Sequence, residues 1–588
     1  MMHYSSETYS TDILIIGSAG AGLRAAIGAV WSARVTILSK GPFGRGGATV
    51  MAGADIMLDG KSLSEMGFAG NPSDSRERFF HDIVVEGFEL NNQKMVQIYV
   101  DEAPNRVREL LEWGMKIDPE RAFSRGVITS GAEILRVLRK RAVKGKVEFF
   151  EFTMATDLLI EDGRVCGAVG VNVRDGRIIF FKARAVILAT GGWHELFAFN
   201  TGSDDLTGDG AAMAYRAGAR LTNMEMVTFC PNIIIHPPAY RATVLLYNFF
   251  TGKLYNAQGN EFLLWQDPEI LHIAQTSEWN KLIFSRAIWM EIKAGRGSPH
   301  GGVYYSLHHI PEVLWKRMER MARWKRGWKF QGKDFTPIIE TLRRGDAVEV
   351  APAAHYFEGG LKVMPNAETG VPGLFAAGEC SGELFGANRV AAATTEMLVQ
   401  GALAARSAVD YIHREQTPEP SIRQKRFLEK ELTAPLGRQS SIASTEIKQE
   451  VQKVAYRTLG PIRHGMELET LKNRIKSWRE ELRRIGAPKR RMHNRAWIEA
   501  MEVRNLLDLI EALCTSALAR KESRGVHSRS DFPEMDNRNW LRNVLVQKDG
   551  ETAVVSTEPI LTTSITPEPV KLNFNDALRR AILMEGES

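Results

Sequence analysis

Residues 12 to 40 constrain the fold of this chain most. An apolar strand at 13–16 runs into the turn GSAGAG and an Ala-rich helical segment, and a second apolar strand follows at 35–38. This is the order of a βαβ dinucleotide unit, in which small residues let the backbone approach a pyrophosphate at a helix N-terminus. The segment therefore predicts a doubly wound parallel sheet that binds a dinucleotide.

The turn of this unit supplies the first cofactor candidates. A tight turn, a close approach to phosphate and close helix packing each require a small residue, and these are Gly17, Ala19, Gly20 and Gly22. An Asp or Glu normally ends the second strand and binds a ribose. Ser39 and Lys40 stand there instead. Either the ribose is held through Ser39 and backbone amides, or the motif is degenerate.

A glycine-rich segment, GPFGRGGATVMAGAD at 41–55, follows the second strand. Its shortage of large side chains suggests a loop that lies tightly against a flat group, with a flexible surface loop as the alternative. The cofactor candidates in it are Gly46, Gly47, Ala48, Thr49 and Gly53.

Apolar spacing of three and four predicts helices at 73–87, 92–113 and 130–143. Runs at 147–152, 155–160, 165–172 and 177–182 contain Asp-Gly turns and predict a β-meander. The segment AVILATGG at 185–192 then returns the chain to the parallel sheet, where ligands bind at the carboxyl edge. Cofactor candidates here are Ala155, Ala189, Thr190 and Gly191.

Asp209 lies in TGDGAAMAYRAGA, near the start of a predicted helix. It is expected either as the N-cap of that helix or as a contact of the cofactor.

From 444 onward, helical patterns at 444–459, 466–485 and 491–519 predict a bundle. The Arg-, Asp- and His-rich run after it predicts an ion-paired network that ties the bundle to the dinucleotide domain.

Residues 354–398 combine adjacent glycines, an apolar strand at 374–377, and an Arg that enters a small-residue helix. This order brings backbone amides, one carboxylate and one guanidinium to the same side of a sheet. We expect a cofactor ring and a substrate to meet there. The candidates are Gly378, Glu379, Arg389 and Thr394 for the cofactor, with His355, Tyr356 and Arg389 toward the substrate.

Composition excludes several classes of protein. The net charge of +6 is small for 588 residues, so nucleic-acid binding is not expected. The four cysteines have no CxxC spacing, which argues against a disulfide framework or a metal or iron–sulfur site in this chain. No apolar run reaches the ~18 residues of a spanning helix. We expect a cytoplasmic protein, with any membrane association made through partner subunits.

The motifs together resemble the flavoprotein subunit of the succinate dehydrogenase and fumarate reductase family, which includes L-aspartate oxidase and the adenylylsulfate reductase flavoprotein. The matching runs are GSAGAGLRAA, AVILATGG, TGDGAAMAYRAGA, HYFEGGL, GLFAAGECSGELFGANR and residues 516–543. The resemblance implies an α/β Rossmann-like FAD-binding domain with an inserted capping domain and a C-terminal helical domain. The expected limits are 1–235 and 346–415 for the FAD domain, 236–345 for the cap, 416–548 for the helices and 549–588 for a tail.

Two departures from the family pattern concern the cofactor and the substrate. Respiratory members attach FAD covalently through the His of a Ser-His-Thr run, whereas this chain has Ala48 there, so noncovalent FAD is expected. The family substrate groups are also altered: Cys230 replaces a His, and Asn248 stands where a proton-donating Arg is expected. Of the family-type substrate groups, His355 and Arg389 remain.

The resemblance implies hydride transfer between flavin N5 and a C=C/CH–CH substrate, with electrons exchanged with an iron–sulfur partner. The departures at Cys230 and Asn248 favour a substrate other than fumarate. Candidate proton donors are Lys253, Tyr356, His236 and Arg241, each of which is also explained as a surface or packing residue. Cys230 is either reactive or a small apolar filler. The alternatives are a sulfur-compound oxidoreductase similar to adenylylsulfate reductase and a flavin electron-transfer subunit without catalysis.

Overall fold

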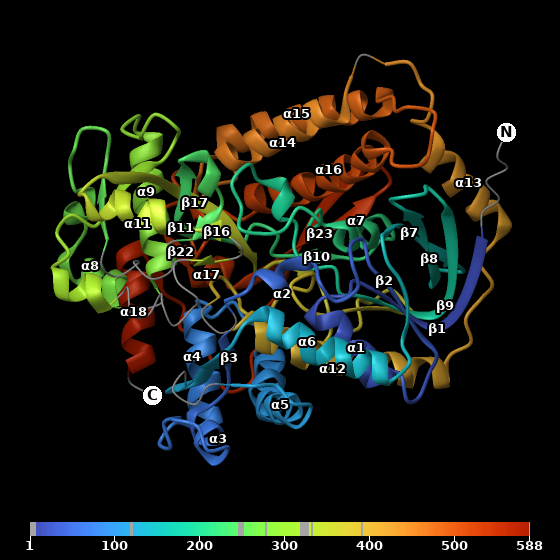
Figure 1. The fold of residues 1–588 in the computed structure, drawn as a ribbon, viewed down its shortest axis with the longest axis horizontal. Coiled ribbons are helices and arrows are strands. Elements are labelled where there is room, and N and C mark those ends of the chain that lie inside the picture. The colour runs from blue at the N-terminus through green and yellow to red at the C-terminus, as the bar shows by residue number, and fades with distance from the viewer. Residues whose placement is uncertain are drawn as a thin grey trace.

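The computed structural model shows a chain organised around one mixed sheet, with an α/β cap on one side and a helical bundle along the top in the view of Figure 1. The two labelled termini lie on opposite sides of the molecule. The structure describes residues 7–53, 55–117, 122–244, 252–276, 279–317, 329–330, 333–389, 392–440 and 442–586.

The main sheet has the strand order β6-β2-β1-β9-β8-β7, with β19 also paired to β9. The parallel part consists of β6 (Glu148–Phe150), β2 (Val35–Leu38), β1 (Glu7–Ile16), β9 (Ile178–Leu188) and β19 (Leu374–Ala376). Both faces of β1 are buried: Ile13 and Ile15 join one apolar cluster, and Leu14 and Ile16 join another. The predicted doubly wound sheet is therefore confirmed.

The predicted meander is only partly correct. The strands β7 (Thr153–Glu161), β8 (Arg164–Asn172) and β9 pair antiparallel in sequence. The run at 147–152 does not belong to the meander, because β6 pairs parallel with β2 at the far edge of the sheet. The runs at 177–182 and 185–189 form a single strand, since β9 pairs with β8 along its first half and with β19 along its second.

Helices form where the apolar spacing predicts them. The helices α4 (Arg76–Glu86), α5 (Gln93–Glu112) and α6 (Gly131–Lys144) begin after Ser75, Asn92 and Ser130, whose side chains each accept a backbone N–H of the first turn. These three helices pack mainly on other helices. The helices α1 (Gly20–Ala29) and α12 (Ala393–Arg414) pack together over the first βαβ unit. Gly28 permits this approach, since a Cβ there would lie 2.8 Å from the Cβ of Ala405.

The cap is built on the five-stranded sheet β12-β11-β17-β14-β13. Its two long strands, β11 (Val227–His236) and β17 (Ala347–Phe357), pair antiparallel and both run back to the FAD domain. The short strands are β12 (Thr243–Val244), β13 (Lys253–Tyr255) and β14 (Val303–Ser306), and the helices are α8 (Pro268–Thr276), α9 (Asn280–Lys293) and α11 (Thr336–Arg343). The expected limits of the cap, 236–345, leave β17 and all of β11 except His236 outside it.

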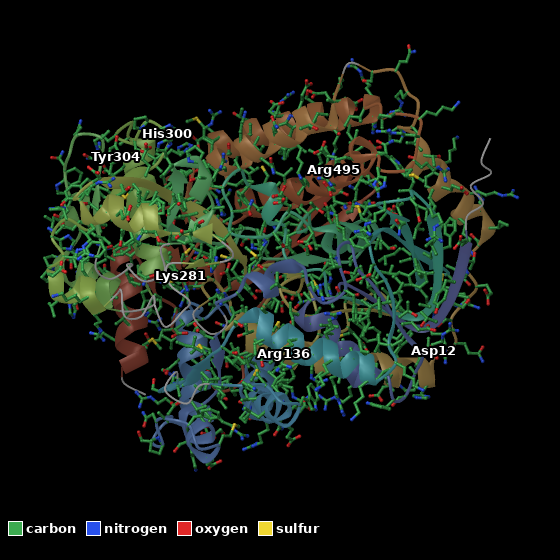
Figure 2. The ribbon with its side chains drawn as sticks, viewed as in Figure 1. Asp12, Arg136, Lys281, His300, Tyr304 and Arg495 are labelled. Atoms are coloured by element: carbon green, nitrogen blue, oxygen red, sulfur yellow. The ribbon has the colours of Figure 1, made fainter. Side chains whose placement is uncertain are left out.

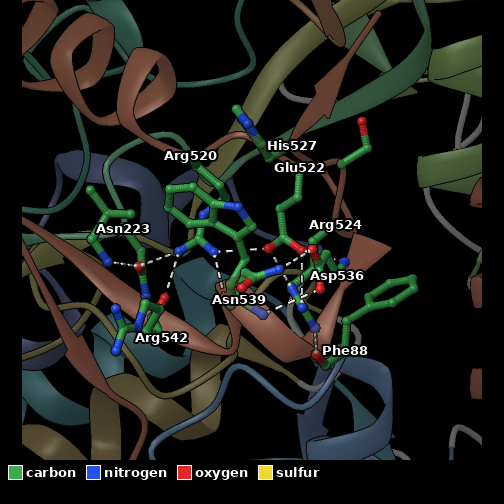
Figure 3. Close-up of polar contacts among 12 residues, drawn as sticks. Phe88, Asn223, Arg520, Glu522, Arg524, His527, Asp536, Asn539 and Arg542 are labelled. Atoms are coloured by element: carbon green, nitrogen blue, oxygen red, sulfur yellow. Dashed lines mark hydrogen bonds and ion pairs between the residues drawn. The ribbon is translucent and has the colours of Figure 1, made fainter. Parts of the chain in front are cut away.

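The C-terminal part contains α13 (Ile422–Thr433), α14 (Ser444–Thr458), α15 (Gly465–Arg484) and α16 (Arg495–Ala519), as the apolar spacing predicts for the last three. A buried ion network follows α16 (Figure 3). Arg520 pairs with Glu225 at 2.5 Å and with Glu522 at 2.9 Å, and Arg524 donates to the Phe88 carbonyl at 2.8 Å. These contacts confirm that ion pairs tie the bundle to the dinucleotide domain.

The last residues are attached at three places. The hairpin of β23 (Arg542–Asp549) and β24 (Thr552–Pro559) pairs with β10 (Leu221–Thr222), and β25 (Lys571–Leu572) pairs with β22 (Met535–Asp536). Helix α18 (Phe574–Gly586) packs against α4. Among the described residues, no helix is both long and apolar enough to span a membrane.

Candidate functional site

The turn between β1 and α1 forms a narrow cradle at the carboxyl edge of the sheet. Gly17 has a φ of +110°, and a Cβ on it would lie 2.1 Å from the carbonyl oxygen of Ala189, the residue that follows β9. A Cβ on Gly22 would lie 1.9 Å from the Gly17 carbonyl oxygen. Ala19 precedes α1 without a capping side chain, and the first turn has no acidic residue. The helix N-terminus is thus prepared for an anion.

The end of β2 places Ser39 beside this cradle. The Ser39 hydroxyl lies 2.7 Å from that of Ser18, and the Gly44 amide donates to Ser18 at 3.1 Å. The Lys40 ammonium contacts Asp209 at 3.3 Å and Glu502 of α16 at 2.9 Å. These two carboxylates raise the pKa of the buried Lys40 above its ordinary value, against the effect of burial.

Of the two alternatives for Asp209, the structure excludes the N-cap. It is the first residue of α7 (Asp209–Arg216), and Gly208 precedes the helix in the left-handed conformation. The Asp209 carboxylate instead accepts hydrogen bonds from Thr207 at 2.7 Å and from Asn505 at 2.9 Å. These hydrogen bonds hold the Asp209 carboxylate in place beside Lys40.

The glycine-rich segment contains a short helix, α2 (Gly47–Met51), and is not a loop throughout. The Thr49 hydroxyl accepts from the Gly20 amide at 3.2 Å, and the Gly47 amide donates to Asp205 at 3.1 Å. A Cβ on Gly46 would lie 2.9 Å from Asp205. The half-exposed Ala48 lies in the same helix, whereas Gly53 is exposed, and a Cβ on it would meet no atom within 4 Å.

The other cofactor candidates lie on neighbouring strand ends. Ala155 is buried on β7, and Thr190 and Gly191 directly follow β9. The Thr394 hydroxyl of α12 donates to the Asp55 carbonyl. Gly378 follows β19 with a φ of +76°, and the next residue, Glu379, accepts from the Gly192 amide at 3.1 Å.

These residues fit a bound dinucleotide. The cradle has no room for a Cβ at Gly17 or Gly22, and backbone amides at the start of α1 face the carboxyl edge of the sheet. The second Glu379 carboxylate oxygen, Oε1, is buried and has no hydrogen-bond partner among the described residues. A buried carboxylate oxygen is costly to leave unpaired, which favours a donor supplied by a bound group.

On the substrate side, Arg389 lies against Tyr356. The guanidinium carbon of Arg389 is 4.3 Å from the centroid of the Tyr356 ring. The Tyr356 hydroxyl donates to the carboxyl of Glu396, a buried residue of α12. Burial, with the nearby Glu396 second, raises the pKa of Tyr356 well above its ordinary value. The phenol therefore stays protonated at neutral pH and supports Arg389.

His355 is held from two sides on β17. Its Nδ1 lies 2.7 Å from the Thr201 hydroxyl, and its carbonyl oxygen lies 3.0 Å from His194 Nε2. Because a carbonyl only accepts, His194 Nε2 carries the hydrogen. His194 Nε2 is also 3.8 Å from Glu379, so this residue connects the cofactor side to His355.

Burial and neighbouring charges set the protonation of this side. Burial, followed by the charges of Arg389, Lys281 and His194, lowers the pKa of His355 well below its ordinary value, so the imidazole is neutral. Burial raises the pKa of Glu358 to about 7 and that of Glu396 to about 8. Near neutral pH, Glu396 is thus mostly protonated and Glu358 is about half protonated.

The remaining candidates have structural partners. Cys230 is buried in a small apolar cluster with Ile233 and Ala353, as the filler interpretation expects. Lys253 pairs with Glu261 at 2.8 Å, and His236 stacks on His300 with ring centroids 4.1 Å apart. Arg241 donates to the Ala198 carbonyl at 3.1 Å. Asn248 lies outside the described residues.

Sequence reasoning missed several residues of this site: His194, Thr201, Lys281, Glu358, Glu396 and Glu502. His194 and Thr201 follow the predicted strand end ATGG within a dozen residues, so their place after it was a usable signal. Glu502 is distant in sequence and lies inside a helix, with no local pattern to connect it to Lys40. Within the described ranges, no cluster of His, Cys, Asp or Glu is arranged to hold a metal ion.

The doubly wound sheet, the cradle at its carboxyl edge and the cap define a flavoprotein of the FAD-binding oxidoreductase class. Residues 12–395 match the FAD binding domain family, and residues 448–573 match the fumarate reductase flavoprotein C-terminal family. The chain belongs to the family of fumarate reductase and succinate dehydrogenase flavoproteins, and it is an FAD-dependent oxidoreductase of that type.

Comparisons with individual proteins agree. The chain is 33% identical to a fumarate reductase (CoM/CoB) chain of Methanothermobacter marburgensis, over 93% of this chain and 98% of that protein. It is similar to Mycobacterium smegmatis Sdh1 in complex with UQ1, with a TM-score of 0.85, 30% identity and coverage of 95% and 96%. An adenosine-5-phosphosulfate reductase complex with sulfite has a TM-score of 0.76 and 22% identity over 96% and 98% of the chains, a likeness that shows the fold alone.

Proposed function

We propose that this chain transfers a hydride between noncovalently bound FAD and the C=C/CH–CH bond of an unsaturated acid other than fumarate. The observation that carries the proposal is Arg389, a cation stacked on Tyr356 next to the neutral His355. Bound FAD would supply the group that accepts or donates the hydride. The residues of the chain would bind and orient the substrate beside it.

The substrate-side residues have separate parts in this proposal. Arg389 would bind the carboxylate that activates the double bond, because a guanidinium can hold a carboxylate through two parallel hydrogen bonds. Neutral His355, fixed by Thr201, would add a hydrogen bond. The charge of Lys281 acts on His355, so a second cation is near the same position. These groups would stabilise negative charge that develops on the substrate as the hydride is transferred.

Two features support a substrate other than fumarate and a noncovalent flavin. The Cys230 thiol, in the place where the family pattern has a His, lies in an apolar cluster and offers no cation to a second carboxylate. Ala48 has no side-chain nitrogen to form a bond with flavin.

We also propose an iron–sulfur partner protein, because the four cysteines are buried and scattered and cannot hold a cluster.

Anaerobic reoxidation of the chemically reduced holoprotein tests this function. Larger 2-enoates should reoxidise the flavin with a kcat/KM about tenfold or more above that of fumarate, a difference of about 1.4 kcal/mol in the transition state. Replacing Arg389 with Ala should abolish turnover while FAD stays bound. The best rate with fumarate would overturn the substrate assignment, and no reoxidation by any enoate would overturn the reaction. A nucleotide-dependent sulfite adduct would instead favour sulfur chemistry.

Acid precipitation of the same holoprotein tests the flavin linkage. All yellow colour should remain in the supernatant, since no residue at position 48 can retain it. Flavin in the pellet would contradict noncovalent binding.

The iron–sulfur partner is tested in the complex purified from its source, which should contain iron and acid-labile sulfide that the isolated chain lacks.

A further inference from the structure

A C=C bond that gains a hydride also needs a proton, and two of the expected donors have another place or partner. His236 stacks on His300, which lies at the outer edge of the cap in Figure 2. Lys281, whose charge acts on the substrate side, lies toward the middle of the molecule in the same view. The Tyr356 hydroxyl donates to Glu396. A buried carboxyl beside the substrate side is better placed to supply the proton.

Glu358 directly follows β17 and is buried near both sides of the site. Its Oε1 accepts from the hydroxyl of Thr228, the residue of β11 that pairs in register with Tyr356. The charge of Arg389, whose guanidinium stacks on the Tyr356 ring, acts on Glu358 from the substrate side. The charge of Glu379 acts on it from the cofactor side. Glu358 therefore lies within electrostatic reach of both sides.

The second carboxyl oxygen of Glu358, Oε2, is the distinctive atom of this position. The residue is 2% exposed, and Oε2 has no hydrogen-bond partner among the residues that the structure describes. Burial raises the pKa of Glu358 to about 7, so about half of the molecules hold its proton at neutral pH. Because Oε1 accepts from Thr228, that proton is carried by Oε2. A buried O–H without an acceptor is costly, which favours a bound ligand beside it.

The charged and titratable groups that face Glu358 keep this proton transferable. Arg389 lowers the pKa of Glu358, and Glu379 raises it. Glu396 of α12 has a pKa of about 8 and is mostly neutral at pH 7. A Glu358 carboxylate formed by proton transfer would thus have a cation nearby. A proton donor is most effective when its pKa is close to the working pH.

We propose that Glu358 is the residue that protonates the substrate, through Oε2. In the direction of reduction, the C=C bond gains a hydride at one carbon from bound FAD in its anionic reduced form and the Oε2 proton at the other carbon. The products are a CH–CH bond, oxidised FAD and the Glu358 carboxylate, which regains a proton from water when the product leaves. The inference rests on the proposed function, because it uses the same substrate, bound at Arg389 and His355.

Single-turnover reoxidation of the chemically reduced, anaerobic holoprotein by hex-2-enoate tests this role. The rate should fall as the pH rises through about 7, because only protonated Glu358 can donate. Glu358→Gln keeps the size of the side chain and an acceptor for Thr228 but has no carboxyl proton. Its rate should be about 100-fold or more lower and should lose this pH dependence. The enoate concentration that gives half the maximal rate should change about twofold or less, since Glu358 does not hold the substrate carboxylate.

Two further variants distinguish a proton donor from a structural residue. The Thr228 hydroxyl lowers the pKa of Glu358, so Thr228→Val should move the pH dependence of the rate to higher pH. Glu358→Asp should keep part of the rate. Glu469→Gln, an exposed change on α15, is the matched control and should leave the rate and its pH dependence as they are. FAD content and the unfolding midpoint report whether each variant folds.

Infrared spectra of the holoprotein give a second measurement that does not depend on turnover. A C=O stretch of a protonated carboxyl should disappear as the pH rises through about 7, and Glu358→Gln should lack it. The corresponding signal of Glu396, which should disappear near pH 8, should remain in that variant. Absence of the first signal from the unchanged protein would overturn the inference, because Glu358 would hold no proton to donate.

The kinetic outcomes separate this inference from the function on which it rests. An unchanged rate and pH dependence in a folded Glu358→Gln would overturn the inference and leave the proposed function intact. If that variant fails to bind FAD, a pH dependence that does not move in Thr228→Val would overturn it instead. No reoxidation by hex-2-enoate or by any other enoate would overturn both.

Discussion

The cofactor side and the substrate side of the site are formed by different parts of the chain: backbone on one side and side chains on the other. The cofactor side consists of backbone and small residues, with Gly17 and Gly22 so close to carbonyl oxygens that no Cβ fits. The substrate side consists of side chains from separate elements: Arg389 after the β19 turn, His355 on β17 and Glu396 on α12. A backbone cradle depends on the conformation of a few consecutive residues. A side-chain cluster depends on how distant elements pack.

The largest effect should come from breaking the cradle at Gly17. In Gly17→Ala, the new Cβ would lie 2.1 Å from the Ala189 carbonyl oxygen, and alanine would have to adopt a φ of +110°. The clash and the strain together should cost about 3 kcal/mol or more, which should abolish FAD binding and leave much of the protein insoluble. FAD content per chain, measured after gel filtration, checks this.

Gly41→Ala is the control for that change. Gly41 lies in the same region, but a Cβ there meets no atom within 4 Å. This variant should bind FAD as the unchanged protein does. If Gly17→Ala retained stoichiometric FAD, the cradle would have to be looser than its geometry indicates, and the contrast between the two sides would disappear.

This contrast also explains what the sequence could and could not predict. The β1-α1 turn, the helices α4 to α6 and the bundle follow from local spacing and were predicted correctly. The edge position of β6 and the continuity of β9 were missed, because strand pairing is decided by partners distant in sequence. The motifs predict His355 and Arg389 as site residues, and this stays a prediction. The sequence does not connect Glu502 to Lys40 or Lys281 to His355, since only the packing of α16 and α9 brings them near.

An intermediate effect on kcat/KM should follow from removing the hydrogen bond between Thr201 and His355 on the substrate side. Thr201→Val keeps the size of the side chain but deletes the hydroxyl that lies 2.7 Å from His355 Nδ1. One hydrogen bond contributes about 1 kcal/mol, so kcat/KM should fall about fivefold to tenfold while FAD content stays the same. Thr557→Val, on exposed strand β24, should leave both unchanged. Loss of FAD in Thr201→Val would show that the two sides are not separable.

The last effect concerns pH and the buried carboxyl that accepts a hydrogen bond from Tyr356. Burial raises the pKa of Glu396 from its ordinary value of 4.5 to about 8, so the folded protein holds a proton that the unfolded chain releases. The resulting stability is fully present below about pH 4.5 and is lost as the pH rises through about 8. The unfolding midpoint of the holoprotein should therefore fall by about 2 °C or more between about pH 5 and pH 8. Glu396→Gln, an uncharged isostere that still accepts from Tyr356, should make this dependence shallower, and Glu358, whose pKa burial raises to about 7, should supply the part that remains. Glu340→Gln, an exposed change on α11, should not change it, and a slope equally steep in Glu396→Gln would show that another group binds the proton.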